Sequence, residues 1–307
     1  MSVNNVKLNN GVLMPEIGLG TWKANEEGVL RETVKKAVAM GYRHIDCAKI
    51  YGNQTEIGKA LAEISVPRKE LFIVSKIWQN RHRPERVEEG LDEILKELQL
   101  DYLDLLLIHW PHAYKPESRC SSLVPPEDEK DDVPIMDTWR AMEKLVESGK
   151  VLSIGVSNFN QAILQAMIPQ CQIVPAVNQV EIHPFNQSTR LVEFCKQNGI
   201  VVTGYCPLGG TKVTVMEDST ITSIASKHSC TPAQVALSWS LEHGVVVIPK
   251  STNEDRLKQN LQRVALTADD MRQIDDISLH ERKVDPARDS KDLEWIFHED
   301  KARCPLI

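Results

Sequence analysis

Four side chains capable of acid–base chemistry stand at or near the ends of predicted strands. Asp46 ends one strand, and Tyr51 follows it five residues later. Lys76 lies in the next predicted strand, and His109 ends the one after that. A lysine beside a phenol lowers the pKa of the tyrosine by favouring phenolate, and Asp46 would hold that lysine charged and oriented. A tyrosine tuned in this way acts as a general acid near neutral pH, while His109 donates a hydrogen bond to a substrate carbonyl.

A single polar residue at a strand end is weak evidence, because polar residues follow strands in every protein. The four groups indicate a catalytic site only when they are taken together, as one acid–base set from neighbouring strands. Lys76 leaves a second chemistry open, since strand-end lysines of barrels also form Schiff bases with carbonyl substrates. In that interpretation the chain is an aldolase, and borohydride would trap a substrate adduct on Lys76. We expect no metal site, and Cys47 and Cys206 are interpreted as packing residues because no partner base is identifiable for either.

The elements that must position these groups alternate along the chain. Short β-branched or apolar runs predict strands over 17–20, 42–46, 71–77, 103–109, 151–156, 176–180, 200–205 and 245–248. Amphipathic stretches predict helices over 27–40, 54–64, 84–98, 137–148, 161–167, 189–197, 218–227 and 253–261, with two more over 232–242 and 268–277. Strict alternation of strand and helix implies a parallel sheet. Eight strands without a composition break imply an α/β fold of the (β/α)8 barrel type, in one domain over residues 1–307.

Local signals support several of these boundaries. Thr231 before Pro232 places a capping hydroxyl ahead of a first-turn proline. Thr267 has an acid three residues on, which is typical of a capping box. Glycines stand where three helices should end, as left-handed caps do; they are Gly149, Gly199 and Gly244.

The main rival to the barrel is a doubly wound sheet with a second domain. Such a fold usually shows a G-x-G-x-x-G turn after an early strand, and this sequence has none. Residues 1–15 predict an N-terminal hairpin, because Asn10-Gly11 is flanked by alternating residues. Two long loops, 112–133 and 283–307, are expected at the C-terminal face of the barrel, where they would line the substrate site.

Short motifs along the chain, taken in order, resemble those of the aldo-keto reductase family. They are Gly41-Tyr42-Arg43-His44-Ile45-Asp46-Cys47-Ala48 with Tyr51-Gly52-Asn53, then Lys76, His109-Trp110-Pro111, Gly155-Val156-Ser157-Asn158-Phe159, Pro175-Ala176-Val177-Asn178-Gln179 and Ile248-Pro249-Lys250-Ser251. Each motif is weak alone, but the ordered set covers nearly the whole chain. The resemblance implies an NADP(H)-dependent oxidoreductase that reduces an aldehyde or ketone to the alcohol, with Tyr51 as the general acid.

The resemblance also assigns cofactor contacts across the barrel top. Ser157, Asn158 and Gln179 would hold the nicotinamide carboxamide, and Tyr205 would stack on its ring. The other implied cofactor-binding residues are Gly20, Thr21, Trp22 and Asp46 near the first strands, Leu208 and Gly209 along the pyrophosphate, Lys250, Ser251, Thr252 and Arg256 at the 2′-phosphate, and Gln259 and Asn260 at the adenine. A non-enzymatic alternative remains, because some proteins of this fold are partners of ion channels: the chain could be a cofactor-binding regulatory subunit with little turnover.

Some positions depart from the commonest family pattern or have a second interpretation. Cys206 stands where serine is frequent, and Gln259 stands where glutamate is frequent, although an amide can still accept from the adenine amine. Ser251 or Thr252 could simply cap the helix over 253–261. Glu254 suits a helix N-terminus but would repel a phosphate if it pointed at one.

The substrate pocket is expected to be lined by aromatic side chains beside the acid–base set. The candidate substrate-binding residues are Trp22, Tyr51, Trp78, His109, Trp110 and Trp295. Such a pocket suits a small carbonyl substrate, with sugars and other aliphatic aldehydes as candidates.

The composition bounds the partners. The net charge of −7 argues against nucleic acid or an anionic membrane as a partner. No export signal or membrane-length apolar run is present, and the seven cysteines are therefore expected to be reduced thiols in a cytoplasmic protein. A closed barrel exposes no sheet edge, which favours a monomer.

Overall fold

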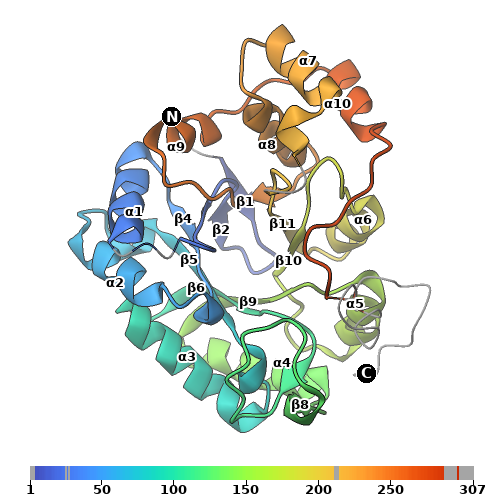
Figure 1. Ribbon diagram of the computed structural model, residues 1–307. Coiled ribbons are helices and arrows are strands. Elements are labelled where there is room, and N and C mark those ends of the chain that lie inside the picture. The colour runs from blue at the N-terminus through green and yellow to red at the C-terminus, as the bar shows by residue number, and fades with distance from the viewer. Residues whose placement is uncertain (1–3, 25, 27, 211–213, 287–295, 297–307) are drawn as a thin grey trace.

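Eight parallel strands form the central sheet of the computed structural model, which describes residues 4–24, 26, 28–210, 214–286 and 296. The strands are β3 (Leu19–Gly20), β4 (His44–Asp46), β5 (Phe72–Ile77), β6 (Leu103–Ile108), β9 (Val151–Ser157), β10 (Val177–Glu181), β11 (Val201–Tyr205) and β12 (Val246–Val247). Each strand pairs with its neighbour in chain order, from β3 to β12. Every predicted strand is therefore present, and helices surround the ring of strands in Figure 1.

The sheet closes on itself between its first and last strands. Ile17 pairs in parallel with Val247, and the Val247 carbonyl accepts from Gly18 N–H at 2.8 Å. A Cβ at Gly20 would lie 2.5 Å from the Ile248 carbonyl oxygen, so only glycine fits where the two chain segments meet. These contacts confirm the predicted (β/α)8 barrel and give Gly20 a packing role.

Helices connect the strands and cover the outside of the barrel. They are α1 (Val29–Met40), α2 (Gln54–Glu63), α3 (Pro84–Leu98), α4 (Ile135–Glu147), α5 (Gln161–Met167), α6 (Thr189–Gln197), α7 (Ser219–Lys227), α8 (Pro232–Glu242), α9 (Glu254–Asn260) and α10 (Ala268–Asp275). The capping boxes of Thr231 and Thr267 both form. The three predicted cap glycines have positive φ angles between 70° and 77°. No helix among the described residues is long and apolar enough to cross a membrane.

The predicted loop 112–133 is more ordered than expected. Two residues at each end pair as a small antiparallel sheet of β7 (Ala113–Tyr114) and β8 (Lys130–Asp131). Arg83 holds this sheet against the barrel through the Asp131 carboxylate at 2.7 Å. The α4 helix then begins at Ile135, two residues before its predicted start at Asp137. Strands of two residues show no periodicity, so β7 and β8 cannot be predicted from the sequence pattern.

The N-terminal hairpin closes the bottom of the barrel. Its strands, β1 (Asn5–Lys7) and β2 (Leu13–Pro15), pair antiparallel as predicted. Leu8 and Met14 pack into one apolar cluster with interior side chains of the barrel strands, including Phe72 and Val74. The side-chain amide of Asn10 donates to the Leu152 carbonyl at 2.9 Å and fixes the turn. The opposite end of the barrel is thereby left to hold the polar groups.

A buried carboxylate joins two of the outer helices. Asp270, in the first turn of α10, is fully buried. It accepts from Lys227 Nζ at 2.8 Å and contacts His228 Nε2 at 2.8 Å, at the end of α7. It also accepts from the backbone and hydroxyl of Thr267. These hydrogen bonds hold the pKa of Asp270 well below its usual range, against the opposing effect of burial.

We predict that Asp270→Asn lowers the free energy of unfolding by about 2 kcal/mol, because hydrogen bonds to a buried charge are lost. A depressed folded-state pKa stabilises the protein above the unfolded pKa of about 3.9 and loses that effect as the pH falls. Asp270→Asn should therefore flatten the acid limb of stability below about pH 4. Urea unfolding between pH 7 and pH 3 tests this, with Asp269→Asn as the exposed control. An acid limb identical to that of the unaltered protein would refute it.

Candidate active site

The acid–base groups meet at the C-terminal end of the barrel. In β5, Phe72 and Val74 face the barrel core, and the period of two places Lys76 above them on the same face. Lys76 is fully buried, and its ammonium donates to both oxygens of Asp46 at 2.8 Å. Gln179, from the far side of the barrel, donates to Asp46 Oδ1 at 2.8 Å. The barrel interior thus ends in a buried ion pair that links β4, β5 and β10.

The third donor of Lys76 is also used. Its ammonium donates to the Cys47 carbonyl at 2.8 Å, so all three N–H bonds have acceptors. A lysine that forms Schiff bases must present a free amine to its substrate. The buried and fully engaged Lys76 ammonium therefore argues against the aldolase interpretation.

Tyr51 ends a short 3-10 helix, Lys49–Tyr51, that follows β4. Lys76 Nζ lies 5.3 Å from the centre of the phenol ring. Burial raises the pKa of Tyr51 well above its usual value, and the negative charge of Asp46 raises it further. The prediction that Lys76 lowers this pKa is therefore wrong for this structure. The reason is physical: the lysine charge is matched by Asp46, which leaves desolvation of the phenolate as the dominant effect.

His109 follows β6 and lies between two aromatic rings. Its ring centre is 5.8 Å from that of Tyr51 and 5.3 Å from that of Trp78, both edge-on. Burial and the nearby Lys76 charge lower the pKa of His109 well below its usual value, so the imidazole is neutral. Its Nδ1 is buried without a hydrogen-bond partner among the described residues.

The side chains expected at the nicotinamide form one hydrogen-bonded group beside this set. Asn158 has a left-handed backbone with φ of 64°, and its amide donates to the His109 carbonyl at 2.9 Å. The Tyr205 hydroxyl donates to Asn158 Oδ1 at 2.8 Å. Ser157 Oγ donates to the Gln179 carbonyl at 2.8 Å. The structure thus brings these four residues together with the acid–base set.

Near β3, Thr21 and Trp22 have different surroundings. Thr21 is fully buried, and its hydroxyl donates to the Asp46 carbonyl at 2.7 Å. Trp22 is 39% exposed, and the Lys23 ammonium lies 4.6 Å from its ring centre. Thr21 therefore braces the strand that carries Asp46, whereas the Trp22 ring is available at the surface.

The residues predicted at the 2′-phosphate lie between β12 and α9. Neither Ser251 nor Thr252 caps the helix, because Asn253 is the N-cap and accepts from Arg256 N–H at 3.0 Å. Glu254 pairs with Lys36 at 2.5 Å, which neutralises the carboxylate that could have repelled a phosphate. Lys250 and Arg256 are exposed. Of the two residues predicted at the adenine, Asn260 is buried and Gln259 is partly buried at the end of α9.

Two of the predicted pocket tryptophans are buried beside the acid–base set. Trp78 donates from Nε1 to the Cys120 carbonyl at 2.9 Å, which ties loop 112–133 to the barrel. Trp110 lies 6.2 Å, between ring centres, from His112. Trp295 and most of the predicted substrate loop 283–307 fall outside the described residues.

A buried carboxylate at the barrel top was not predicted. Glu181 ends β10, two residues after Gln179, and is fully buried. It contacts His183 Nε2 at 2.9 Å and accepts two backbone N–H bonds from the segment after α10. The predicted strand stopped one residue earlier, at Val180, which placed Glu181 outside the set of interior residues. Its spacing of two from Gln179 was the signal that could have revealed it.

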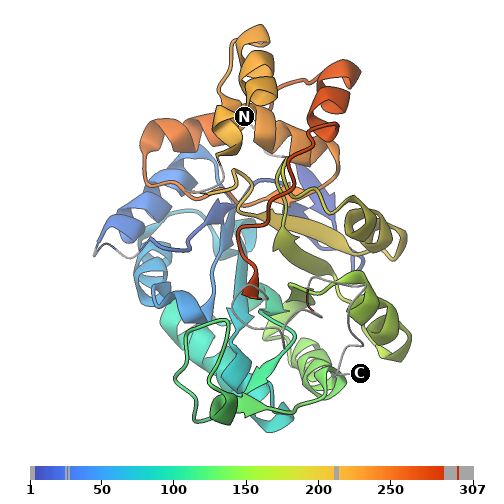
Figure 2. The same ribbon diagram turned by 45° about the vertical axis from the view of Figure 1, so that its right-hand side comes forward.

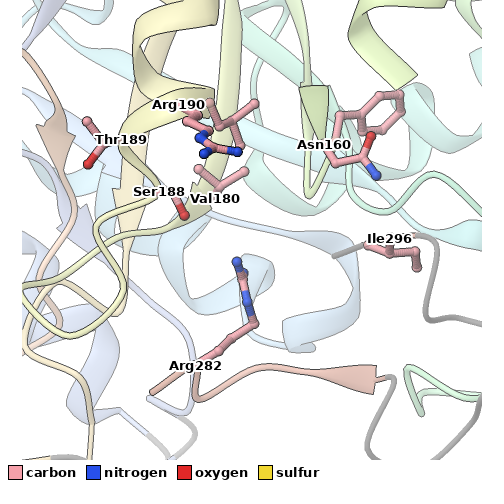
Figure 3. A pocket seen from close by; sticks show the side chains of 9 residues that line it. Asn160, Val180, Ser188, Thr189, Arg190, Arg282 and Ile296 are labelled. Carbon is pink, nitrogen blue, oxygen red and sulfur yellow. The ribbon is translucent and has the colours of Figure 1, made fainter. Parts of the chain in front are cut away.

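A cavity of about 320 Å³ lies between α5, α6 and the segment after α10, apart from the acid–base set. Arg190 and Arg282 extend toward it from opposite sides in Figure 3. Phe159, Asn160, Val180, Ser188, Thr189, Leu191 and Ile296 complete its lining. Tyr51, Lys76 and His109 do not contribute to that lining. We therefore place the candidate chemistry at the barrel mouth rather than in this cavity.

Residues 16–279 match the model of the aldo/keto reductase family. The chain is 40% identical to aldo-keto reductase family 1 member A1 of Cricetulus griseus over 300 residues, covering 92% of this chain and 91% of the relative. It is 40% identical to an NAD(P)H-dependent D-xylose reductase of Candida tropicalis over 317 residues, covering 93% of this chain and 95% of the relative. An aldose reductase structure from Schistosoma japonicum superposes with a TM-score of 0.90 at 39% identity, covering 97% of this chain and all of the other.

We predict that Lys76→Met lowers the free energy of unfolding by about 3–5 kcal/mol, because it leaves the buried Asp46 carboxylate without its cation. The double variant Asp46→Asn/Lys76→Met should be more stable than the single variant, since no uncompensated charge remains. Urea unfolding of the ligand-free protein at pH 7 measures both. Strictly additive losses for Asp46→Asn and Lys76→Met would contradict the coupling.

Proposed function

The chain belongs to the aldo/keto reductase family, and on that basis we propose that it reduces an aldehyde or ketone to the alcohol with NADPH. A protonated phenol, a neutral imidazole and a buried lysine–carboxylate pair lie together at one end of the barrel. This arrangement supports the proposal best, because it offers a proton and a hydrogen bond to a carbonyl oxygen at one place. We propose that residues 1–307 form one catalytic domain.

Tyr51 is the proposed proton donor. Since burial raises its pKa, the phenol carries its proton at neutral pH and can give it to the oxygen as that oxygen becomes an alkoxide. A neutral His109 can donate one hydrogen bond to the same oxygen without adding charge to the site. The proton leaves Tyr51 Oη and becomes the hydroxyl proton of the alcohol.

NADPH, when bound, supplies the hydride for the carbonyl carbon. The side chains present fit such a group. Ser157, Asn158 and Gln179 offer amide and hydroxyl groups in one cluster, with the Tyr205 ring beside them. Lys250, Ser251 and Arg256 offer two cations and a hydroxyl at the other end, where Glu254 is already neutralised by Lys36.

We propose a small carbonyl compound as the substrate, with sugars and other aliphatic aldehydes as the first candidates. Two of the relatives are named for D-xylose and for aldose reduction. The buried indoles of Trp78 and Trp110 restrict the space beside His109, which favours a compact substrate. Oxidation of NADPH followed at 340 nm, against a panel of aldehydes, ketones and sugars, tests the activity. A protein that binds NADPH but oxidises it with none of them would be the regulatory subunit instead.

We predict that Tyr51→Phe keeps its affinity for NADPH while kcat falls about 10²–10⁴-fold, since the hydroxyl acts only in the transition state. Steady-state kinetics with the best substrate of the panel gives kcat, and tryptophan fluorescence gives the cofactor Kd. Tyr102→Phe removes a tyrosine hydroxyl far from the barrel mouth and should leave both values unchanged. A Tyr51→Phe protein with near-full kcat would remove Tyr51 from the mechanism.

We further predict that Arg256→Ala raises the Kd for NADPH about 10- to 100-fold and leaves that for NADH almost unchanged. The planar guanidinium suits a phosphate, and a hydrogen bond to a charged group contributes about 1.5–3 kcal/mol. High salt should shrink the NADPH penalty by screening the contact. Fluorescence titration of both cofactors measures this. Equal losses for NADPH and NADH would mean that Arg256 supports the fold or the adenine.

A further inference from the structure

The segment that follows α10 crosses the C-terminal end of the barrel and is anchored there by its backbone. We call residues 281–284 the strap; Figure 2 shows it as the red segment that descends from α10 across the barrel. Lys283 and Val284 donate their N–H groups to the two carboxylate oxygens of Glu181 at 2.5 and 2.6 Å. Glu281 N–H donates to the Phe185 carbonyl at 2.8 Å. A fully buried carboxylate on β10 therefore fixes the course of the strap.

The anchored backbone places the Lys283 side chain on the turn that follows β11. A Cβ added at Gly210 would lie 2.6 Å from Lys283 Cε and 2.7 Å from Cδ. The absence of a side chain at Gly210 therefore makes room for the lysine. Gly209 and Gly210 have φ angles of 73° and 86°, in the left-handed region that favours glycine. The strap thus carries an ammonium group to the glycine turn, residues 208–210.

A second lysine reaches the same region from another loop. Burial and the Glu181 charge raise the pKa of the Cys206 thiol, two residues before the glycine turn, and the positive charges of Lys283 and Lys23 both oppose that rise. Neither lysine has an ion-pair partner among the described carboxylates. In a chain of net charge −7, two such cations beside one glycine turn form a site for an anion.

We propose that Lys283 of the strap binds the pyrophosphate of the dinucleotide cofactor, together with Lys23 and the glycine turn. This inference rests on the proposed function, which supplies a ligand with a negatively charged pyrophosphate. Leu208 and Gly209 belong to the same turn and are the residues expected along that group. The strap then acts on cofactor affinity through a lysine that lies far along the chain from the other cofactor residues.

Glu181 is the positioning residue in this arrangement. Its carboxylate accepts from the strap and contacts His183, and its negative charge acts on Cys206 in the opposite direction to the two lysines. By fixing the backbone at Lys283, it limits the directions in which the ammonium can point. Cofactor binding should in turn stabilise the strap, because coupling between two bound groups is reciprocal.

The test compares three ligands on two variants. Lys283→Met should raise the Kd for NADPH and for NADH alike, by about 10-fold at low salt, because both carry the pyrophosphate. It should leave adenosine 2′-monophosphate unchanged, since that ligand lacks the pyrophosphate. Arg256→Ala should show the opposite pattern, with losses for NADPH and adenosine 2′-monophosphate and none for NADH. Fluorescence titration supplies all the Kd values without any turnover.

Two controls separate charge from structure. Lys283→Arg keeps the cation and should hold both dinucleotide Kd values within about 3-fold of the original. Lys196→Met removes the same charge from an exposed position on α6 and should change none of them. Hydrogen exchange at the amides of Lys283 and Val284 should slow when NADH binds to the unaltered protein.

Three outcomes would overturn the inference. Unchanged NADPH and NADH affinities in Lys283→Met would show that the lysine does not meet the pyrophosphate. An equal loss for adenosine 2′-monophosphate would show general damage to the site. If the unaltered protein binds neither dinucleotide, the proposed function itself fails, and that result is distinct from the other two.

Discussion

The structure of the barrel mouth depends on one buried ion pair, that of Lys76 with Asp46. Two charges at the end of an apolar interior are stable only because each has several partners. The pair and Gln179 link β4, β5 and β10 across the barrel interior, and Lys76 Nζ lies 5.3 Å from the centre of the Tyr51 ring. The apolar plug below, built by the N-terminal hairpin, keeps water from reaching the pair from the other end. The apolar plug and the buried ion pair therefore occupy opposite ends of the same barrel.

Most of the fold could be predicted because local and global signals agree. Short β-branched or apolar runs predicted every barrel strand, and capping residues such as Thr231 and Thr267 predicted helix starts. What could not be predicted lies where periodicity gives no information. The two-residue strands β7 and β8 are too short to show alternation. Asn253 caps α9. The sequence cannot single it out, because Ser251, Thr252 and Asn253 are all favourable N-cap residues and only the backbone geometry selects among them.

The proximity of the acid–base side chains could be predicted from the sequence, but their electrostatics could not. Sequence order placed Asp46, Lys76 and His109 at the ends of neighbouring strands, and the barrel brings them together. Whether the pKa of Tyr51 is raised or lowered could not be predicted from sequence order. It depends on which acceptors bind the Lys76 ammonium and on how completely the phenol is buried. Glu181 was not predicted because the predicted strand ends at Val180, one residue before the end of β10. One residue decides the outcome here, because side chains along a barrel strand alternate between the inside and the outside.

The strap is fastened to Glu181 by its peptide N–H groups, and the Val284 side chain also packs against the core. Every residue except proline supplies such a group, so evolution can replace nearly any strap residue without loosening the grip of Glu181. The backbone hydrogen bonds that hold the strap and the strap side chains that face the barrel mouth are thus under separate selection. Related proteins could diverge in what they accept while retaining the same closed architecture.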